Sequence, residues 1–210
     1  MWTNTKDFCD AAEHFKKYGF YTADPVDSPA WHQYWDEMER RCLEGYSIGG
    51  RRITGQHYFY LNFKEIQLTK DEDLLTGVTK NKSSRSGKIR TFPDFWDGDA
   101  EYFQFLEDAW NNGEHALVLK SRRKGYSYKN SSLATWAYSF IRKSQTYICA
   151  YEKELYKSIV MMTSDQLNFL NEHTGFGKTR DYIDKTSFEG FHVEASYKKY
   201  LEGGQSVKKI

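Results

Sequence analysis

Apolar side chains recur at three- and four-residue spacing in two segments near the N-terminus. In KDFCDAAEHFKKYGF this spacing predicts a short amphipathic helix that ends at Gly19. DSPAWHQYWDEMERRCLEG repeats the pattern, with Ser28 in the position of a cap and Gly45 after the last turn. The chain is therefore expected to open with two helices.

The period of the pattern changes after Gly45. Gly49 and Gly50 are typical of a hairpin turn, and the β-branched and aromatic run that follows favours extended structure. A packed strand is the simplest interpretation of HYFYLNF, and an aromatic platform for nucleic acid is the alternative. Residues 1–68 are expected to form a helical and β-hairpin extension ahead of the main domain.

Basic and small polar residues dominate the next stretch, residues 69–90, which contains TKNKSSRSGKIR and shows no apolar periodicity. We expect a flexible basic loop here. Contact with phosphates or with a partner is the alternative interpretation of the same charges.

From Thr91 onward, helical and extended patterns alternate. DGDAEYFQFLEDAWNNG predicts a helix capped by Asp97 or Asp99, and HALVL predicts a short buried strand. A helix from about residue 127 to 141 and a strand at TYICA follow.

The alternation continues with a helix from about residue 152 to 170 and with strands near FHVEAS and SVKKI. Strands that alternate with helices at this spacing predict parallel strands joined by crossover helices. The predicted fold class is therefore α/β, with a P-loop NTPase-like, mainly parallel sheet in residues 91–210.

Composition and charge narrow the classes of function. The 210 residues include 39% hydrophobic and 17% aromatic residues, which is enough for an ordered globular core. Thirty Lys and Arg against 29 Asp and Glu leave a net charge of +1. Any contact with nucleic acid is therefore expected from local basic clusters, because the field of the whole molecule is weak.

Cysteine and histidine spacing does not predict a metal site. The three cysteines lie far apart and form no CxxC pair, and the histidines show no HxxxH spacing. No apolar stretch approaches the ~18 residues of a membrane span, and the first residues are too polar for a secretory signal. We expect a soluble protein with reduced thiols, located inside a cell.

The residues Lys120–Ser127, which read KSRRKGYS, have the outline of a phosphate-binding loop of the form GxxxxGK[ST]. Gly125 takes the position of the second glycine, and Ser127 takes that of the hydroxyl residue. Tyr126 replaces the usual lysine, and Lys120 replaces the first glycine. The predicted strand before this loop and the predicted helix after it are the context that such a loop requires.

A tyrosine cannot supply the positive charge of the missing lysine, because the pKa of a phenol is about 10. Lys120 can supply it, because both ends of such a loop lie close to the phosphates and the lysine stem is long and flexible. The sequence context favours nucleotide binding. The alternative is a basic surface turn that binds no nucleotide.

The segment LVLKSRRKGYSYKNSS resembles the ATPase loop of the large terminase subunit of tailed bacteriophages, the motor that packages DNA into procapsids. Lambda-type members of that family have a loop of the form K-S-x-R-x-G-Y-S. GYSIGGRRITGQHYFYLNF and FPDFWDGDAEYFQFLEDA also resemble segments ahead of the loop in phage large subunits. The resemblance runs from about residue 15 to 151 and implies an ATPase that uses ATP and Mg²⁺.

Carried over residue by residue, the resemblance gives Lys120 the phosphate charge and Ser127 the magnesium ligand. Gly125 would allow close approach of the backbone, and Arg122 or Arg123 would stabilise charge on the transferring phosphoryl group. Surface solvation of these arginines is the alternative. The residues predicted to bind the cofactor in this loop are Lys120, Ser121, Arg122, Arg123, Lys124, Gly125, Tyr126 and Ser127.

The resemblance also implies contacts to adenine from RTFPDFWDGD, just ahead of the predicted helix. Phe95 or Trp96 could stack on the base, and Arg90 could bond to it. Core packing is the favoured interpretation of the two aromatic residues, because aromatic side chains ahead of an amphipathic helix usually fill the core.

The resemblance implies double-stranded DNA, a portal protein and a small terminase subunit as partners, self-association into a ring, and the host cytoplasm as the location. Two alternatives stay open. One is a non-catalytic module that binds DNA or a capsid through the basic clusters 80–90 and 120–129. The other is a different P-loop ATPase, such as a helicase-like protein.

The acidic motif that completes a magnesium site in such enzymes is not apparent after Ser127, because no apolar strand ends in paired acids. The chain is expected to end before that strand and before any nuclease domain. The sequence therefore predicts weak binding of ATP with Mg²⁺ and slow hydrolysis or none by this chain.

Overall fold

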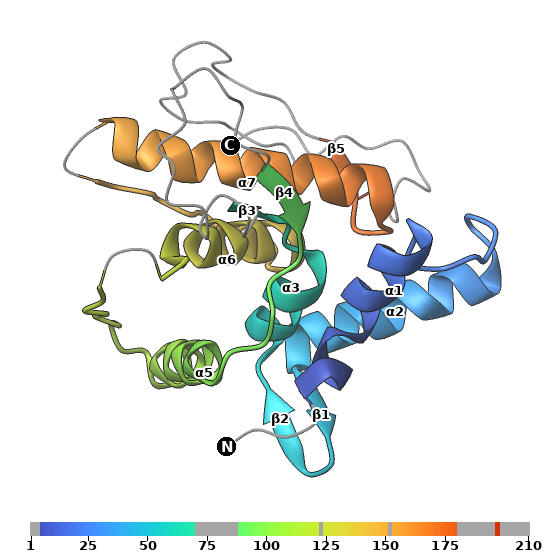
Figure 1. The fold of residues 1–210 in the computed structure, drawn as a ribbon, viewed down its shortest axis with the longest axis horizontal. Helices are drawn as coiled ribbons and strands as arrows, with labels where there is room; N and C mark the ends of the chain where they lie inside the picture. The colour runs from blue at the N-terminus through green and yellow to red at the C-terminus, as the bar shows by residue number, and fades with distance from the viewer. Residues whose placement is uncertain (1–4, 70–87, 122–123, 151–152, 180–195, 198–210) are drawn as a thin grey trace, which may run out of the picture.

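The computed structural model describes residues 5–69, 88–121, 124–150, 153–179 and 196–197 (Figure 1). Helices form most of the described structure. Its elements are η1 (Thr5–Cys9), α1 (Asp10–Tyr18), α2 (Pro29–Glu44), β1 (Tyr46–Ile48), β2 (Arg51–Ile53), α3 (Gly55–Phe63), β3 (Ile66–Thr69), β4 (Lys88–Thr91), α5 (Asp97–Asn112), α6 (Tyr126–Phe140), α7 (Lys153–His173), β5 (Lys178–Thr179) and β6 (Ser196–Tyr197).

The first two predicted helices are confirmed, and their ends have local causes. α1 ends at Gly19, which adopts the left-handed conformation with φ 78° and donates its N–H to the carbonyl of Phe15. α2 begins after Ser28, whose Oγ accepts a hydrogen bond of 3.2 Å from the N–H of Trp31. The predicted hairpin is also confirmed, because β1 and β2 pair antiparallel around Gly49 and Gly50.

The predicted strand at HYFYLNF is wrong, because these residues form the central helix α3. Thr54 caps it by accepting a bond of 3.2 Å from the N–H of His57. Every residue of the helix except Gln56 is buried, so apolar residues are required all around it. Burial by α1, α2, α5 and α6 therefore overrides the intrinsic preference of aromatic residues for strands.

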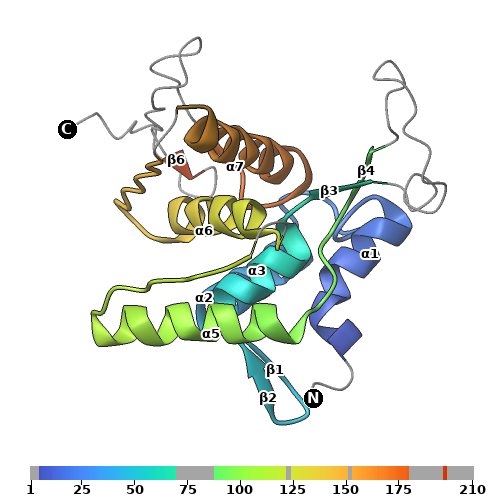
Figure 2. The same ribbon diagram turned by 60° about the vertical axis from the view of Figure 1, so that its left-hand side comes forward.

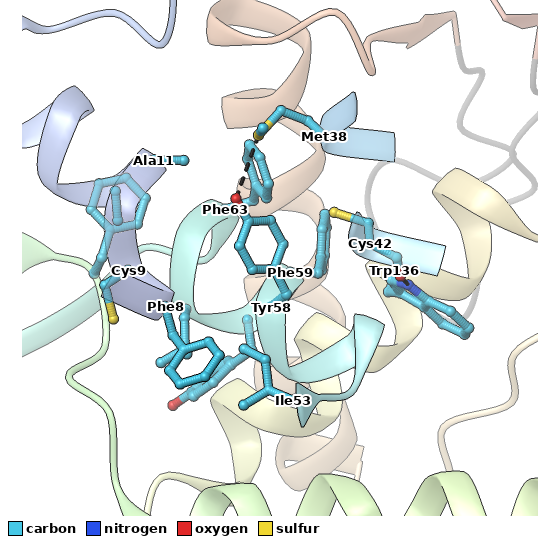
Figure 3. Close-up of a cluster of buried hydrophobic side chains, with 14 of the residues drawn as sticks. Phe8, Cys9, Ala11, Met38, Cys42, Ile53, Tyr58, Phe59, Phe63 and Trp136 are labelled. Carbon is cyan, nitrogen blue, oxygen red and sulfur yellow. Dashed lines mark hydrogen bonds between the residues drawn. The ribbon is translucent and has the colours of Figure 1, made fainter. Parts of the chain in front are cut away.

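Side chains from several helices pack around α3 (Figure 3). The backbones of α2 and α3 approach so closely that a Cβ at Gly55 would lie 2.1 Å from the carbonyl oxygen of Cys42. That carbonyl accepts a bond of 2.7 Å from Nε1 of Trp136, which ties α6 to the same point. This aromatic core holds the helices together at the position of Gly55.

Asn62 is the polar link within this core. Its Oδ1 accepts from the N–H of Ala12 at 3.0 Å, and its Nδ2 donates to the carbonyls of Phe8 and Tyr58 at 2.8 and 3.0 Å. The side chain is fully buried, so these bonds replace those it would make to water. Asn62 thereby fixes η1 and α1 against α3.

The predicted α/β fold with a P-loop NTPase-like parallel sheet is wrong for the part of the chain that the structure describes. The strands there pair as β1–β2, β3–β4 and β5–β6, three antiparallel two-stranded sheets, with no parallel pair joined by a crossover helix. The predicted strand SVKKI lies outside the described residues, as do most residues of FHVEAS.

HALVL and TYICA are extended but are not paired as strands. Leu117, Leu119 and Tyr147 are 82%, 90% and 81% exposed. An apolar run indicates that a segment can enter a sheet, but a strand forms only beside a neighbour that satisfies its N–H and C=O groups. Neither segment has such a neighbour among the described residues, and this explains the wrong prediction.

The three long helices of the second half are confirmed as α5, α6 and α7. Figure 2 shows α7, α6, α3 and α5 one above another, and contacts join each neighbouring pair. The predicted cap at Asp97 or Asp99 is wrong. Trp96 holds the cap position of α5 and makes no side-chain cap bond, while the two acids lie in the first turn. None of the helices in the described ranges is long and apolar enough to span a membrane.

Candidate phosphate-binding site at the start of helix α6

The sequence-predicted loop lies directly ahead of α6. Gly125 occupies the cap position in the left-handed conformation, with φ 70°, and its carbonyl accepts from the N–H groups of Tyr128 and Lys129 at 3.0 and 3.1 Å. No side chain caps this end. The first N–H groups of a helix have no acceptor within the helix, and together with the helix dipole they favour an anion.

Lys120 stands at the other end of the loop and also lies near the start of α6. Its side chain is exposed, and its Nζ lies 5.7 Å from the centroid of the Tyr126 ring. The ammonium group therefore lies on the side of the loop that faces the first turn of α6. Ser127 is exposed in the same turn, so its hydroxyl is accessible to solvent.

The other predicted loop residues are distributed around this turn. Ser121 and Lys124 are exposed. Arg122 and Arg123, the two predicted catalytic arginines, lie outside the described residues. Of the predicted site residues, the structure places Gly125 and Ser127 at the start of α6 and Nζ of Lys120 near the ring of Tyr126.

Tyr126 anchors the start of α6 to α5. Its ring packs edge-on against Tyr102 with centroids 4.9 Å apart, and Nζ of Lys129 lies 4.3 Å from its centroid. The hydroxyl of Tyr102 bonds at 3.2 Å to Oδ1 of Asn130. The tyrosine at the usual lysine position of the loop therefore has a packing role.

Sequence reasoning missed the ion pair beneath this turn. Lys129 is 4% exposed and pairs with Asp99 in the first turn of α5. A buried ammonium of this kind requires a close carboxylate, because burial without a partner is costly. Its charge is already neutralised, so Lys120 is the better candidate for contact with an added anion. The two residues are far apart in sequence, and no local motif links them.

The three predicted adenine contacts lie in different surroundings. Phe95 stacks on Phe8 at 5.7 Å and lies 5.2 Å from the ring of His57, so it packs against the core as the favoured interpretation expects. Trp96 is 68% exposed, so the core interpretation is wrong for this residue. Arg90 lies on β4, where its Nη1 is 3.7 Å from Oε2 of Glu65.

Metal-ligating and nucleophilic groups add little to this site. In the part of the chain that the structure describes, no three His, Cys, Asp or Glu side chains gather as a metal site would require. Burial raises the pKa of Cys9 to about 12, and it also raises the pKa of the buried Cys42 thiol. Both thiols therefore stay protonated. Of the basic cluster 80–90, only residues 88–90 are described.

Comparison with known proteins adds no relative: no family model, no curated protein and no solved structure matches this chain. The site must be interpreted from its geometry alone. That geometry consists of an uncapped helix start, a flexible lysine beside it and an exposed hydroxyl in its first turn. Chemically, this arrangement can bind an anion such as a phosphate group.

Proposed function

We propose that Lys120–Ser127 binds the phosphates of ATP with Mg²⁺, and that the chain is the N-terminal nucleotide-binding part of a phage terminase large subunit. The observation that carries the proposal is the position of the sequence motif at the start of helix α6. The K-S-x-R-x-G-Y-S sequence ends in the first turn of α6, with left-handed Gly125 at the cap and the ammonium of Lys120 beside Tyr126.

Each residue has a distinct role in this proposal. Lys120 neutralises phosphate charge, and the N–H groups of Tyr126 and Ser127 at the helix start donate to phosphate oxygens. Gly125 has no Cβ, so its backbone can turn sharply and approach the ligand closely. Arg122 or Arg123 is proposed to stabilise charge on the transferring group.

The hydroxyl of Ser127 fits one ligand position of Mg²⁺. This ion prefers oxygen ligands and keeps several waters and phosphate oxygens around it, so one protein hydroxyl is compatible with its binding. Bound there, Mg²⁺ would neutralise charge on the phosphates. Ser127 is accessible for this role because its side chain is exposed in the first turn.

In the intact motor, the proposed partners follow from the same resemblance. They are double-stranded DNA, the portal protein, the small terminase subunit and further copies of the chain in a ring. ATP hydrolysis at this loop would then drive DNA into the procapsid in the host cytoplasm. Hydrolysis is proposed for the motor, while the property proposed for this chain is binding.

Titration of a fluorescent ATP analogue with Mg²⁺ into wild type, Lys120→Ala and Lys17→Ala tests this. Both substitutions remove one exposed lysine charge, and Lys17 lies on α1, outside the loop. A charge-assisted hydrogen bond contributes about 1.5–3 kcal/mol, so Lys120→Ala should weaken binding by about 10- to 100-fold. Lys17→Ala should change the affinity by less than about threefold.

Equal affinity of Lys120→Ala and wild type would contradict the proposal. A module that binds DNA phosphates would instead bind DNA with an affinity that falls steeply with salt, and it would be indifferent to ATP. Repeating the titration with a DNA duplex at two salt concentrations separates these outcomes.

A further inference from the structure

A cavity of about 240 Å³ opens between β3, the first turn of α6 and the middle of α7. In Figure 1, β3 lies between the ribbons of α6 and α7. Lys64 at the C-terminal cap of α3, Tyr128 of α6 and Gln166 of α7 line it, and Arg90 of β4 also contributes. Apart from Arg90, none of these residues is among those predicted from the sequence.

Two buried polar side chains belong to the cavity lining. Lys64 is 2% exposed, and its Nζ donates to the carbonyl of Met162 at 2.9 Å, which uses one of its three donors. Gln166 is 3% exposed, and its Nε2 donates to the carbonyl of Phe63 at 3.3 Å, which holds this wall in place. Because Oε1 of Gln166 is buried, the donor available to a ligand from this pair is Lys64.

The other lining side chains include aromatic rings and flexible thioethers. Tyr128 and Phe169 contribute rings, and Met161 and Met162 contribute thioethers, which adapt well to the face of an aromatic ligand. The hydroxyl of Tyr128 accepts from the N–H of Gln67 at 3.2 Å, so this residue is held in place. Such walls suit a planar ring.

The charges around the cavity balance. Lys64 and Arg90 are opposed by Glu65 and Asp165, and Arg90 lies within ion-pair distance of Glu65. A phosphate would therefore find no excess of positive charge, whereas a neutral ligand would not disturb the balance. Burial lowers the pKa of Lys64 to about 7, so the amine is partly neutral at neutral pH and is suited to bond with an uncharged acceptor.

The size of the cavity points to a ligand smaller than a whole nucleotide. Sites for drug-sized ligands measure about 300–1,000 Å³, and this cavity lies just below that range. A bicyclic heterocycle has the matching size. The edge of adenine or guanine also presents an acceptor, a ring nitrogen or a keto oxygen, which complements the donor Lys64.

We propose that this cavity binds a purine base, with Nζ of Lys64 donating to a ring nitrogen or keto oxygen and the rings and thioethers of the lining packing on its faces. As the base site of a nucleotide, it rests on the proposed function. Tyr128 follows Gly125 by less than one helical turn, so the cavity and the phosphate-binding loop adjoin at the start of α6.

Methionine methyl NMR tests the proposal directly. Met161 and Met162 line the cavity, whereas Met38 lies in the core cluster away from it, so the same spectrum holds the reporters and an internal control. Adenosine and guanosine are titrated separately, with cytidine and uridine as pyrimidine controls. We expect either purine nucleoside to shift the signals of Met161 and Met162 and to leave Met38 unchanged.

Substitutions in the lining test whether the purine nucleoside binds in this cavity. Lys64→Met keeps the chain length and removes the donor, and it should weaken purine binding by at least tenfold. Met161→Trp should also abolish binding by filling the cavity, and it covers the case in which Lys64→Met does not fold. Lys17→Met, an exposed lysine of α1, should bind as wild type does. Unshifted Met161 and Met162 signals, equal shifts with pyrimidines, or purine binding unaffected by Lys64→Met would overturn the proposal.

Inorganic triphosphate with Mg²⁺ separates this proposal from the phosphate site. If triphosphate binds and no purine nucleoside binds, the base site is rejected and the phosphate site is supported. Binding of a purine nucleoside without triphosphate would support the base site and reject the phosphate site. Under both proposals, Lys120→Ala should weaken triphosphate binding by about 10- to 100-fold and leave adenosine or guanosine binding unchanged.

Discussion

The core around α3 and the extended segments HALVL and TYICA differ in how each is stabilised. Leu61 of α3 is 0% exposed, while Leu119, which directly precedes Lys120, is 90% exposed. The core residues are held by helix packing and by buried hydrogen bonds such as those of Asn62. HALVL and TYICA have no strand partners in the described structure.

This difference shows what an apolar pattern can and cannot determine. The same aromatic and aliphatic residue types occur in HYFYLNF and in HALVL, yet the first is a buried helix and the second an exposed extended segment. Burial depends on which neighbours the fold provides, and periodicity over a short run does not report them. Stability should therefore concentrate in the α3 core, and the loop should be open to ligands.

The largest difference between the α3 core and the segment HALVL should come from the same substitution, leucine to alanine, made in each. Leu61→Ala removes a fully buried side chain and should lower the free energy of unfolding by about 2–5 kcal/mol. Leu119→Ala removes an exposed one and should change it by less than about 0.5 kcal/mol. Urea unfolding followed by circular dichroism measures both. Similar losses in the two variants would mean that the extended segment is packed in solution.

Asn62→Ala tests the polar part of the core. The substitution leaves the N–H of Ala12 and the carbonyl of Phe8 buried without their partner, so it should cost about 2–4 kcal/mol. Asn111→Ala, at an exposed position in α5, should stay within about 0.5 kcal/mol of wild type. The same urea titration measures both, and a neutral Asn62→Ala would show that these bonds contribute nothing net.

His57 should make the core sensitive to acid. Burial, together with the charge of Lys129, lowers the pKa of His57 to about 3, whereas its unfolded value is about 6.5. As the pH falls from about 6.5 towards 3, His57 binds a proton in the unfolded chain but not in the folded chain. The free energy of unfolding therefore falls by up to about 1.4 kcal/mol per pH unit.

His57→Phe should remove this part of the pH dependence and keep the stacking on Phe103. The measurement is the difference in free energy of unfolding between wild type and variant at pH 7.5, 6 and 5. The free energy of unfolding of the variant minus that of wild type should become more positive as the pH falls. A constant difference would indicate that His57 is not desolvated.

The smallest effects should come from two glycines. Gly125→Ala forces a Cβ into the left-handed conformation at the cap of α6 and should cost about 1 kcal/mol. Gly98→Ala in the first turn of α5 meets open space and should stabilise by about 0.5–1 kcal/mol. Thermal melts of the two variants should therefore shift in opposite directions. A shift in the same direction would exclude the left-handed cap in solution.

Features that depend on a few adjacent residues, such as helix ends, could be predicted from the sequence. Ser28 and Gly19 marked helix ends because a cap or a left-handed turn depends on a few adjacent residues. The position of the loop ahead of α6 was predictable for the same reason. α3 was not, because its helical state depends on burial by residues distant in sequence.

The candidate site was predictable only in part. Lys120, Gly125 and Ser127 could be found from their spacing, whereas the pairing of Lys129 with Asp99 and the joining of Lys64 with Gln166 in one cavity arise from tertiary packing. The parallel sheet was wrong because apolar runs were taken to imply partners. A strand pattern describes one segment only. A strand forms when that segment pairs with a second one elsewhere in the chain, and the pattern does not identify the second segment.

The central claim is that the start of α6 binds triphosphate, and backbone amide NMR tests it most directly. Inorganic triphosphate with Mg²⁺ is titrated while the amide signals of Tyr126 and Ser127 are compared with those of Leu61 and Asn62 in the core. We predict large saturable shifts at Tyr126 and Ser127, none in α3, and loss of the response in Lys120→Ala. Unchanged signals at the start of α6, or a response that Lys120→Ala leaves intact, would contradict the account.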